Sequence, residues 1–194
     1  MTTWFSSDFH LGHHNIIKYC ERPFTDVDHM NRELIARHNA VVKPDEHFWH
    51  IGDFSMSEKY VPLIKQMNGI AHLCAGNHDI CHPANRKYTD DAIKRYIDYG
   101  FVEVVMETHF GPFLISHMPY TDYDDKRHKV KYSQYRPKDT GEPLLCGHIH
   151  KAFKVKGAMI NVGCDVWDYK PVSYEELLAI KDDYSLKNKL GLSV

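Results

Sequence analysis

Residues 70–79 read I-A-H-L-C-A-G-N-H-D, an apolar run followed by a glycine and three polar side chains. The apolar run predicts a buried β-strand, and the glycine lets the backbone turn sharply where the strand ends. A second apolar run, 48–51, ends in the same way in Gly52-Asp53, and a helix is expected between the two runs, over 57–67. This order of strand, helix and strand predicts a βαβ unit with parallel strands, and therefore an α/β fold.

The rest of the chain continues this alternation. Thr2–Phe5 is β-branched and aromatic and predicts a first strand, and Asp28 opens a helical pattern of apolar residues. Ser173 and Glu176 form a capping-box pattern, which predicts a C-terminal helix. Further elements are expected as a helix over 91–99 and strands over 101–106, 113–116, 144–146, 153–155 and 159–162. Because no repeat or flexible linker interrupts the pattern, we expect one domain over residues 1–194.

The composition argues against several classes of protein. The 194 residues carry a formal net charge of −2, so nothing attracts the whole chain to nucleic acid or anionic lipid. There is no basic stretch before an apolar one at the N-terminus, and no apolar run reaches the roughly 18 residues of a membrane helix. These features predict a cytoplasmic protein that does not enter membranes. The five cysteines show no C-x-x-C pair, which favours reduced structural thiols over disulfides or a thiolate zinc site.

Polar clusters follow five of the predicted strands. They are Asp8-x-His10, Gly52-Asp53, Gly76-Asn77-His78-Asp79, Ser116-His117 and Gly147-His148-x-His150. In α/β sheets, sites are built at the carboxyl ends of strands. Carboxylate, imidazole and amide ligands without thiolate suit manganese, iron, nickel or zinc. The clusters hold too many such side chains for one tetrahedral ion, and enough for two ions that share a carboxylate.

Each cluster alone also has an ordinary structural explanation. An Asp-x-His or a Gly-Asp at a strand end is usually a turn or a helix cap, and 76–79 also suits a turn. His117 by itself is more often a hydrogen-bonded core histidine, and His148 and His150 could simply share one face of a strand. The occurrence of all the clusters at strand exits, in this order, favours a shared site over independent coincidences.

The same series of residues resembles the complete motif set of the calcineurin-like metallophosphoesterases, over positions 8–150. The opening D-F-H-L-G-H-H-N, the R-P-F at 22–24 and the closing stretch 161–173 further resemble a small subgroup from phages and bacteria. The resemblance implies an α/β fold in which two mixed β-sheets pack as a sandwich flanked by helices, with the site at one edge. It also implies an enzyme, a metal-dependent hydrolase of phosphoester bonds.

Carried over residue by residue, the resemblance implies two divalent metal ions, with manganese ranked before iron, nickel and zinc. One ion would be held by Asp8, His10, Asp53 and His150, and the other by Asp53, Asn77, His117 and His148. Two ions roughly 3.5–4 Å apart can clamp a phosphoryl group and hold a bridging hydroxide that attacks the phosphorus. Of the remaining motif residues, His78 would assist the leaving group and Asp79 would orient His78.

Substrate contacts are less well determined by the sequence. His13 and Asn15 match the subgroup pattern, although a helix cap also explains Asn15. Arg22 could meet a phosphate, or it could pack and pair locally. Three other histidines close to the motifs have no assigned role and are expected at the solvated surface; they are His14, His82 and His109.

The segment 126–138 is basic, contains no acidic residue and is interleaved with tyrosines. One interpretation is a solvated surface loop that balances nearby acidic residues. The other is a flap over the substrate, in which cations neutralise phosphates and tyrosines stack on a base. The residues expected to contact substrate in that case are Lys129, Lys131 and Tyr132.

The leading hypothesis is a phosphodiesterase that acts on nucleotide or RNA-derived phosphoesters, including single-stranded RNA. Alternatives with the same site are a phosphomonoesterase, a protein phosphatase or a nuclease. An alternative of another class is a non-catalytic interaction scaffold, which the intact ligand set argues against.

Overall fold

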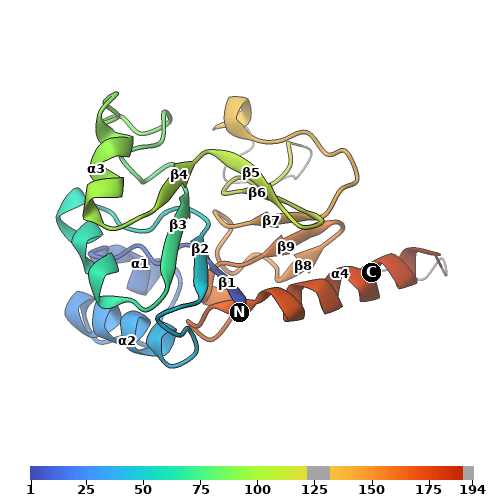
Figure 1. Ribbon diagram of the computed structural model, residues 1–194, viewed down its shortest axis with the longest axis horizontal. Coiled ribbons are helices and arrows are strands. Elements are labelled where there is room, and N and C mark those ends of the chain that lie inside the picture. Colours follow the sequence, from blue (N-terminus) through green and yellow to red (C-terminus); the bar gives the residue numbers. More distant parts are fainter. Residues whose placement is uncertain (122–131, 190–194) are drawn as a thin grey trace.

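The computed structural model describes residues 1–121 and 132–189. Within them, two mixed β-sheets of five strands each pack against one another, and helices flank the pair (Figure 1). The α/β sandwich expected from the sequence is therefore confirmed.

The first sheet has the strand order β10-β1-β2-β3-β4. Its members are β1 (Thr3–Ser6), β2 (His47–His50), β3 (Ile70–Cys74), β4 (Glu103–Val105) and β10 (Val172–Ser173). β1 to β4 are parallel, and β10 pairs antiparallel with β1. The carboxyl ends of β1, β2 and β3 therefore lie at the same edge of the sheet.

The second sheet has the order β5-β6-β7-β9-β8. Its members are β5 (Glu107–Phe110), β6 (Phe113–Ser116), β7 (Leu144–Cys146), β8 (Val155–Lys156) and β9 (Met159–Asn161). β6, β7 and β9 are parallel, whereas the outer strands β5 and β8 are antiparallel to their neighbours. The exits of β6 and β7 carry the two polar clusters contributed by this sheet.

The strand expected over 101–106 is wrong in one respect. The stretch holds only β4 of the first sheet, which ends at Val105, and the chain then enters the second sheet at Glu107 as β5, a strand that the sequence pattern did not predict. An apolar pattern indicates which residues are buried. It does not indicate which strand supplies the hydrogen-bond partners, so it could not predict that the chain changes sheets at Met106.

The α-helices are α1 (His14–Tyr19), α2 (Val27–Asn39), α3 (Ala92–Tyr99) and α4 (Tyr174–Lys189). Asp26 caps α2 by accepting the His29 N–H at 2.7 Å. The predicted capping box at α4 is present, because Ser173 Oγ accepts the Glu176 N–H at 3.2 Å and the Glu176 carboxylate accepts the Ser173 N–H at 3.1 Å. None of the helices in the described part of the chain is both long enough and apolar enough to cross a membrane.

The helix expected over 57–67 is a 3₁₀-helix, η1 (Glu58–Gln66), with Pro62 in its interior. Proline has no N–H to donate and its ring clashes with an α-helical backbone, which accounts for the difference. Two further short 3₁₀ segments, η2 (Ser133–Tyr135) and η3 (Cys164–Val166), lie in the second half of the chain.

Apolar side chains form three clusters. The largest joins the first sheet to the helices beside it and includes Phe9, Leu34 and Phe54. The second brings together residues of both sheets, such as Trp49 of β2 and Ile115 of β6. The third lies on the second sheet, around residues that include Tyr120, Leu144 and Ile149. All five cysteines are free and buried, as expected.

Candidate metal centre

The polar clusters converge where the carboxyl ends of the two sheets meet. Glycines permit this approach because they have no side chain to fill the gap. A Cβ atom added at Gly52 would collide with the His117 ring, and one at Gly76 would collide with the Asp53 carboxylate. The strand exits of β2, β3 and β6 therefore touch one another directly at these two glycines.

The Asp53 carboxylate lies at the centre of the cluster and is 2% exposed. Its Oδ1 accepts the backbone N–H of His78 at 2.8 Å. Its Oδ2 lies 3.4 Å from His117 Nε2, 3.6 Å from His10 Nε2 and 3.9 Å from His78 Nε2. One carboxylate oxygen is thus surrounded by imidazoles that come from β1, β3 and β6.

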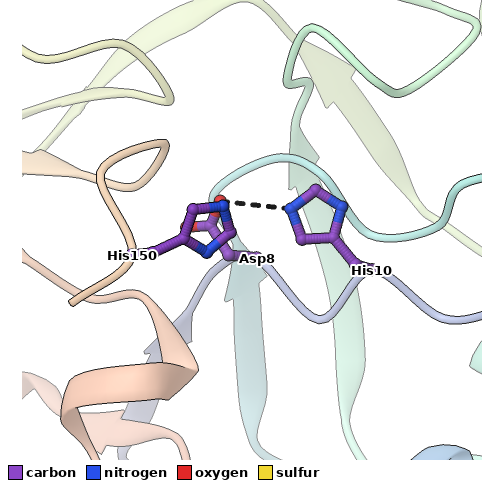
Figure 2. Close-up of side chains that lie close together, drawn as sticks. All are labelled: Asp8, His10 and His150. Atoms are coloured by element: carbon purple, nitrogen blue, oxygen red, sulfur yellow. Dashed lines mark ion pairs between the residues drawn. The ribbon is translucent and has the colours of Figure 1, made fainter. Parts of the chain in front are cut away.

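On one side of Asp53, donor atoms of Asp8, His10 and His150 lie within 4.8 Å of one another (Figure 2). Asp8 Oδ1 is 3.8 Å from His10 Nε2, the contact that is dashed in the figure. Asp8 Oδ2 accepts the Ser7 hydroxyl at 2.6 Å, which helps to fix the carboxylate. These three side chains are among those predicted for the first ion.

On the other side, donor atoms of Asp53, His117 and His148 also lie within 4.8 Å of one another. His117 Nδ1 donates to the Ile51 carbonyl at 2.8 Å, which leaves Nε2 facing Asp53. Asn77 is buried at the exit of β3. The two groups of donors contain six of the seven side chains that the resemblance assigns to the two ions, and the assignment to metal stays a prediction.

Several buried donor atoms of this centre have no hydrogen-bond partner among the described residues. They are both ring nitrogens of His10, Nε2 of His117 and Oδ1 of Asn77. Burying such atoms without a partner is costly unless a ligand binds them. Their imidazole and amide chemistry, with the carboxylates beside them, fits divalent ions such as manganese, iron, nickel or zinc.

Charge interactions set the protonation states of the centre. Burial alone would raise the pKa of Asp53, but nearby imidazoles, with His117 the strongest, hold it well below its ordinary value. The same contact outweighs burial at His117 and raises the pKa of that ring to about 9. Burial lowers the pKa of His10 well below its ordinary value. Asp53 is therefore ionised and His10 neutral at pH 7, the forms that bind metal, whereas His117 is protonated and would release a proton when an ion binds.

The backbone at several predicted ligands is left-handed. The φ angles are 60° at Asp8, 50° at His10, 54° at Asp53, 70° at His148 and 47° at His150. Such a conformation in a non-glycine residue costs of order 1–3 kcal/mol and persists where the surrounding structure enforces it, often at functional sites. Five of the nine non-glycine residues with such angles in the described part of the chain are therefore predicted metal ligands.

His150 is held by a residue that the sequence did not single out, Asp165. Asp165 Oδ2 lies 3.0 Å from His150 Nδ1 and fixes the ring so that Nε2 is the remaining donor. The available signal was indirect, because Asp165 lies in the stretch 161–173 that resembles the subgroup. Carboxylates in this position orient metal-binding histidines and increase their basicity.

Of the two interpretations of Arg22, local packing and pairing agrees with the structure, and contact with a substrate phosphate does not. Its guanidinium is buried and donates to both oxygens of Asp165, at 2.8 and 2.9 Å. It also donates to the carbonyls of Asp8 at 2.7 Å and Phe9 at 2.9 Å. With these donors engaged inside the protein, Arg22 supports Asp8 and Asp165 instead of meeting a phosphate.

The expected orientation of His78 by Asp79 is also wrong. The Asp79 carboxylate accepts the backbone N–H groups of Asp53 at 2.8 Å, Gly76 at 2.9 Å and Phe54 at 3.0 Å. Within the described part of the chain it has no hydrogen bond to the His78 ring. The turn after β3 points the two neighbouring side chains in different directions, so Asp79 holds the loops that carry Asp53 and Gly76.

Two of the remaining substrate candidates, His13 and Tyr132, lie close to predicted ligands. The His13 ring centroid is 5.7 Å from that of His10, and the Tyr132 ring centroid is 5.9 Å from that of His148. Asn15 is exposed inside the first turn of α1, whose N-cap residue is His13, so the cap explanation for Asn15 does not hold. Lys129 and Lys131 lie outside the described residues.

Comparisons with known proteins agree with this geometry. Residues 1–170 match the model of the calcineurin-like phosphoesterase superfamily domain. An uncharacterized protein of Methanocaldococcus jannaschii is 28% identical over 185 residues, which cover 90% of this chain and 88% of that protein. The Gene 66 protein of Mycobacterium phage L5 is 29% identical over 197 residues, which cover 90% of this chain and 91% of the phage protein.

The crystal structure of a protein of unknown function from Aquifex aeolicus has the same fold. It superposes with a TM-score of 0.63 and 24% identity, over 92% of this chain and 98% of that one. Since the family model matches residues 1–170, the chain belongs to the calcineurin-like phosphoesterase superfamily.

Proposed function

We propose that this protein is a two-metal phosphodiesterase that hydrolyses nucleotide or RNA-derived phosphoesters. The observation that carries the proposal is the position of Asp53 Oδ2, within 3.6 Å of imidazole nitrogens from both ligand groups. A single carboxylate between two sets of donors is what a shared ligand of two ions requires. The unpartnered nitrogens of His10 and His117 support the same assignment.

In this proposal Asp8, His10 and His150 hold one ion, Asn77, His117 and His148 hold the other, and Asp53 holds both. When bound, two divalent ions supply the positive charge that activates a water nucleophile and neutralises the phosphoryl oxygens. Manganese is the proposed metal, with iron, nickel and zinc as alternatives, because the donors are nitrogen and oxygen without thiolate.

His78 has a different role in the proposal, that of general acid. Its side chain is 43% exposed, in contrast to the buried ligands, so it faces the position of an incoming substrate. Its Nε2 lies 3.9 Å from Asp53 Oδ2, close enough to act on the same phosphoryl group. We assign it to proton donation to the leaving oxygen, or to stabilisation of charge there.

The choice of a nucleotide-like substrate rests on what surrounds the centre. Aromatic side chains such as Tyr132 lie at its rim, and bases stack on such rings. We also propose a cytoplasmic location, which the five free cysteines support because disulfides are rare there.

The test combines metal content with a substrate screen. The purified protein is loaded with manganese and assayed on bis-p-nitrophenyl phosphate, cyclic nucleotides, dinucleotides, single-stranded oligonucleotides and phosphomonoesters. We expect two bound ions per chain and turnover of diesters that a chelator stops and manganese restores. Two bound ions without turnover of any ester would favour a scaffold, and faster turnover of monoesters would favour a phosphomonoesterase.

A further inference from the structure

A cavity of about 210 Å³ lies directly beside the metal centre, with His117 in its wall. Its other walls come from the end of β3, from Met106 and Glu107 where the chain changes sheet, and from Tyr135 of η2. It is smaller than the roughly 300–1,000 Å³ of sites that enclose a whole drug-sized ligand. The space therefore suits one part of a substrate whose phosphoryl group lies at the metals.

His82 lines this cavity and is only 3% exposed, so the expectation that it is a surface histidine is wrong. Its Nδ1 accepts the N–H of Ala84 at 3.0 Å, which requires the neutral tautomer with the proton on Nε2. Burial lowers the pKa of His82 to about 4, in agreement with a neutral ring. His82 therefore offers one N–H donor, whose direction does not change with pH near neutrality.

The other walls complete a mixed aromatic and polar lining. The Tyr135 ring packs edge to face against His82, with centroids 5.0 Å apart. Glu107 contributes a carboxylate acceptor, and Met106 and Met118 contribute polarizable thioethers. Heteroaromatic rings have a flat face that stacks on an aromatic side chain, and an edge that needs both donors and acceptors.

We propose that this cavity receives the nucleobase of the substrate, stacked on Tyr135 and with its polar edge between the His82 N–H and the Glu107 carboxylate. The proposal rests on the phosphodiesterase function proposed above. It narrows the substrate class to nucleotides, and it gives His82 and Tyr135 a role in positioning the base beside the metals.

The experiment compares two inhibitors that differ by the base alone, AMP and ribose 5-phosphate. Both compete with hydrolysis of methyl p-nitrophenyl phosphate by the manganese-loaded full-length protein. We expect AMP to inhibit about 5- to 150-fold more strongly, which is the range that stacking of one base on an aromatic side chain provides. Tyr135→Ala and His82→Phe should reduce the AMP advantage about tenfold, whereas Tyr135→Phe, which keeps the ring, should retain it.

His109→Ala is the matched control, because His109 is an exposed histidine on the neighbouring strand β5 that does not line the cavity. AMP should inhibit the His109→Ala variant as strongly as it inhibits the wild type. Equal inhibition by AMP and ribose 5-phosphate in the wild type would overturn the proposal. Phenyl phosphate inhibiting as strongly as AMP would also overturn it, since the cavity would then accept any aromatic ring.

A second measurement separates this proposal from the proposed function. If the wild type hydrolyses no ester with any metal, the phosphodiesterase function fails. Calorimetric titration of adenosine into the wild type and Tyr135→Ala still tests the cavity, since it requires no turnover. Binding to the wild type that is lost in Tyr135→Ala supports base recognition, and the absence of binding overturns it.

Discussion

Buried histidines occur in two regions of this molecule, and the two regions differ in what surrounds each ring. At the carboxyl edge of the sheets, His10 and His117 are 2% and 1% exposed and face the Asp53 carboxylate. In the core beside the helices, His38 and His50 are completely buried and lie against the Phe48 ring. Equal burial therefore accompanies two different chemical roles.

The difference shows that convergence on a carboxylate, and not burial, identifies a candidate ligand. His38 Nε2 donates to the Asn68 carbonyl at 2.8 Å, an ordinary core hydrogen bond. Burial lowers the pKa of His38 to about 4, whereas at His117 the Asp53 carboxylate outweighs burial and raises the pKa to about 9. Substitutions in the two regions should therefore affect metal binding and stability separately.

The largest effect is expected for Asp53→Ala, which removes the carboxylate placed between both ligand groups. We expect loss of both bound ions and a fall in kcat of about 1,000-fold or more, because catalysis then lacks the charge that the metals supply. Metal analysis and diester hydrolysis measure the two losses. Asp98→Ala, an exposed aspartate on α3 paired with Lys94, is the control and should retain both ions. Retention of both ions by Asp53→Ala would contradict a shared ligand.

His78→Ala should show that His78 has a different role from the histidines predicted to bind metal. Only the side chain is lost, so the backbone N–H that holds Asp53 remains and both ions should stay bound. Activity should fall about 100- to 10,000-fold on nucleoside esters, whose leaving oxygen needs a proton. The fall should be smaller on p-nitrophenyl esters, whose leaving group needs none. An equal fall on both substrates would assign His78 to binding.

Asp165→Asn should weaken the contact that orients His150 in the first ligand group and leave the second ligand group unchanged. The variant can no longer offer a carboxylate to His150 Nδ1, so affinity for one of the two ions should fall roughly 10- to 100-fold. Stepwise metal titration measures the two sites. Asp168→Asn, three residues away and exposed, is the matched control. The same weakening in both variants would show that Asp165 has no special link to the metal centre.

The sequence points to most of this site because each cluster places polar side chains directly after a predicted strand, in three of the five clusters next to a glycine. Short sequence patterns do not predict contacts between residues that are far apart in the chain. Arg22 and Asp165 are 143 positions apart, so their ion pair leaves no local pattern. The prediction for Asp79 is wrong for the opposite reason. Asp79 is next to His78 in the sequence, but adjacency does not reveal the direction in which the turn points the Asp79 side chain.

The fold is predictable to a similar degree. Strands such as β3 and β6 and the capping box at Ser173 are found where the patterns indicate. The change of sheet at Met106 and the 3₁₀ form of η1 depend on pairing and on Pro62, which periodicity does not describe. The chain has fifteen histidines, and His38 and His50 show that a buried histidine need not face a carboxylate or belong to the metal centre.

The smallest effect concerns the core, where His38→Gln should alter stability and leave metal binding unchanged. The folded pKa of His38, about 4, is below the ordinary value of 6.5, so its neutral form is favoured on folding. This contribution is complete above pH 6.5 and is lost as the pH falls toward 4. Between pH 6.5 and 5.5 the wild type should therefore lose about 1 kcal/mol that the variant retains. Glutamine can still donate to the Asn68 carbonyl, so the comparison isolates the titration. Urea unfolding of both metal-free proteins at the two pH values measures it, with the exposed His14→Gln as control. Parallel losses in wild type and variant would show that His38 is not the group that titrates.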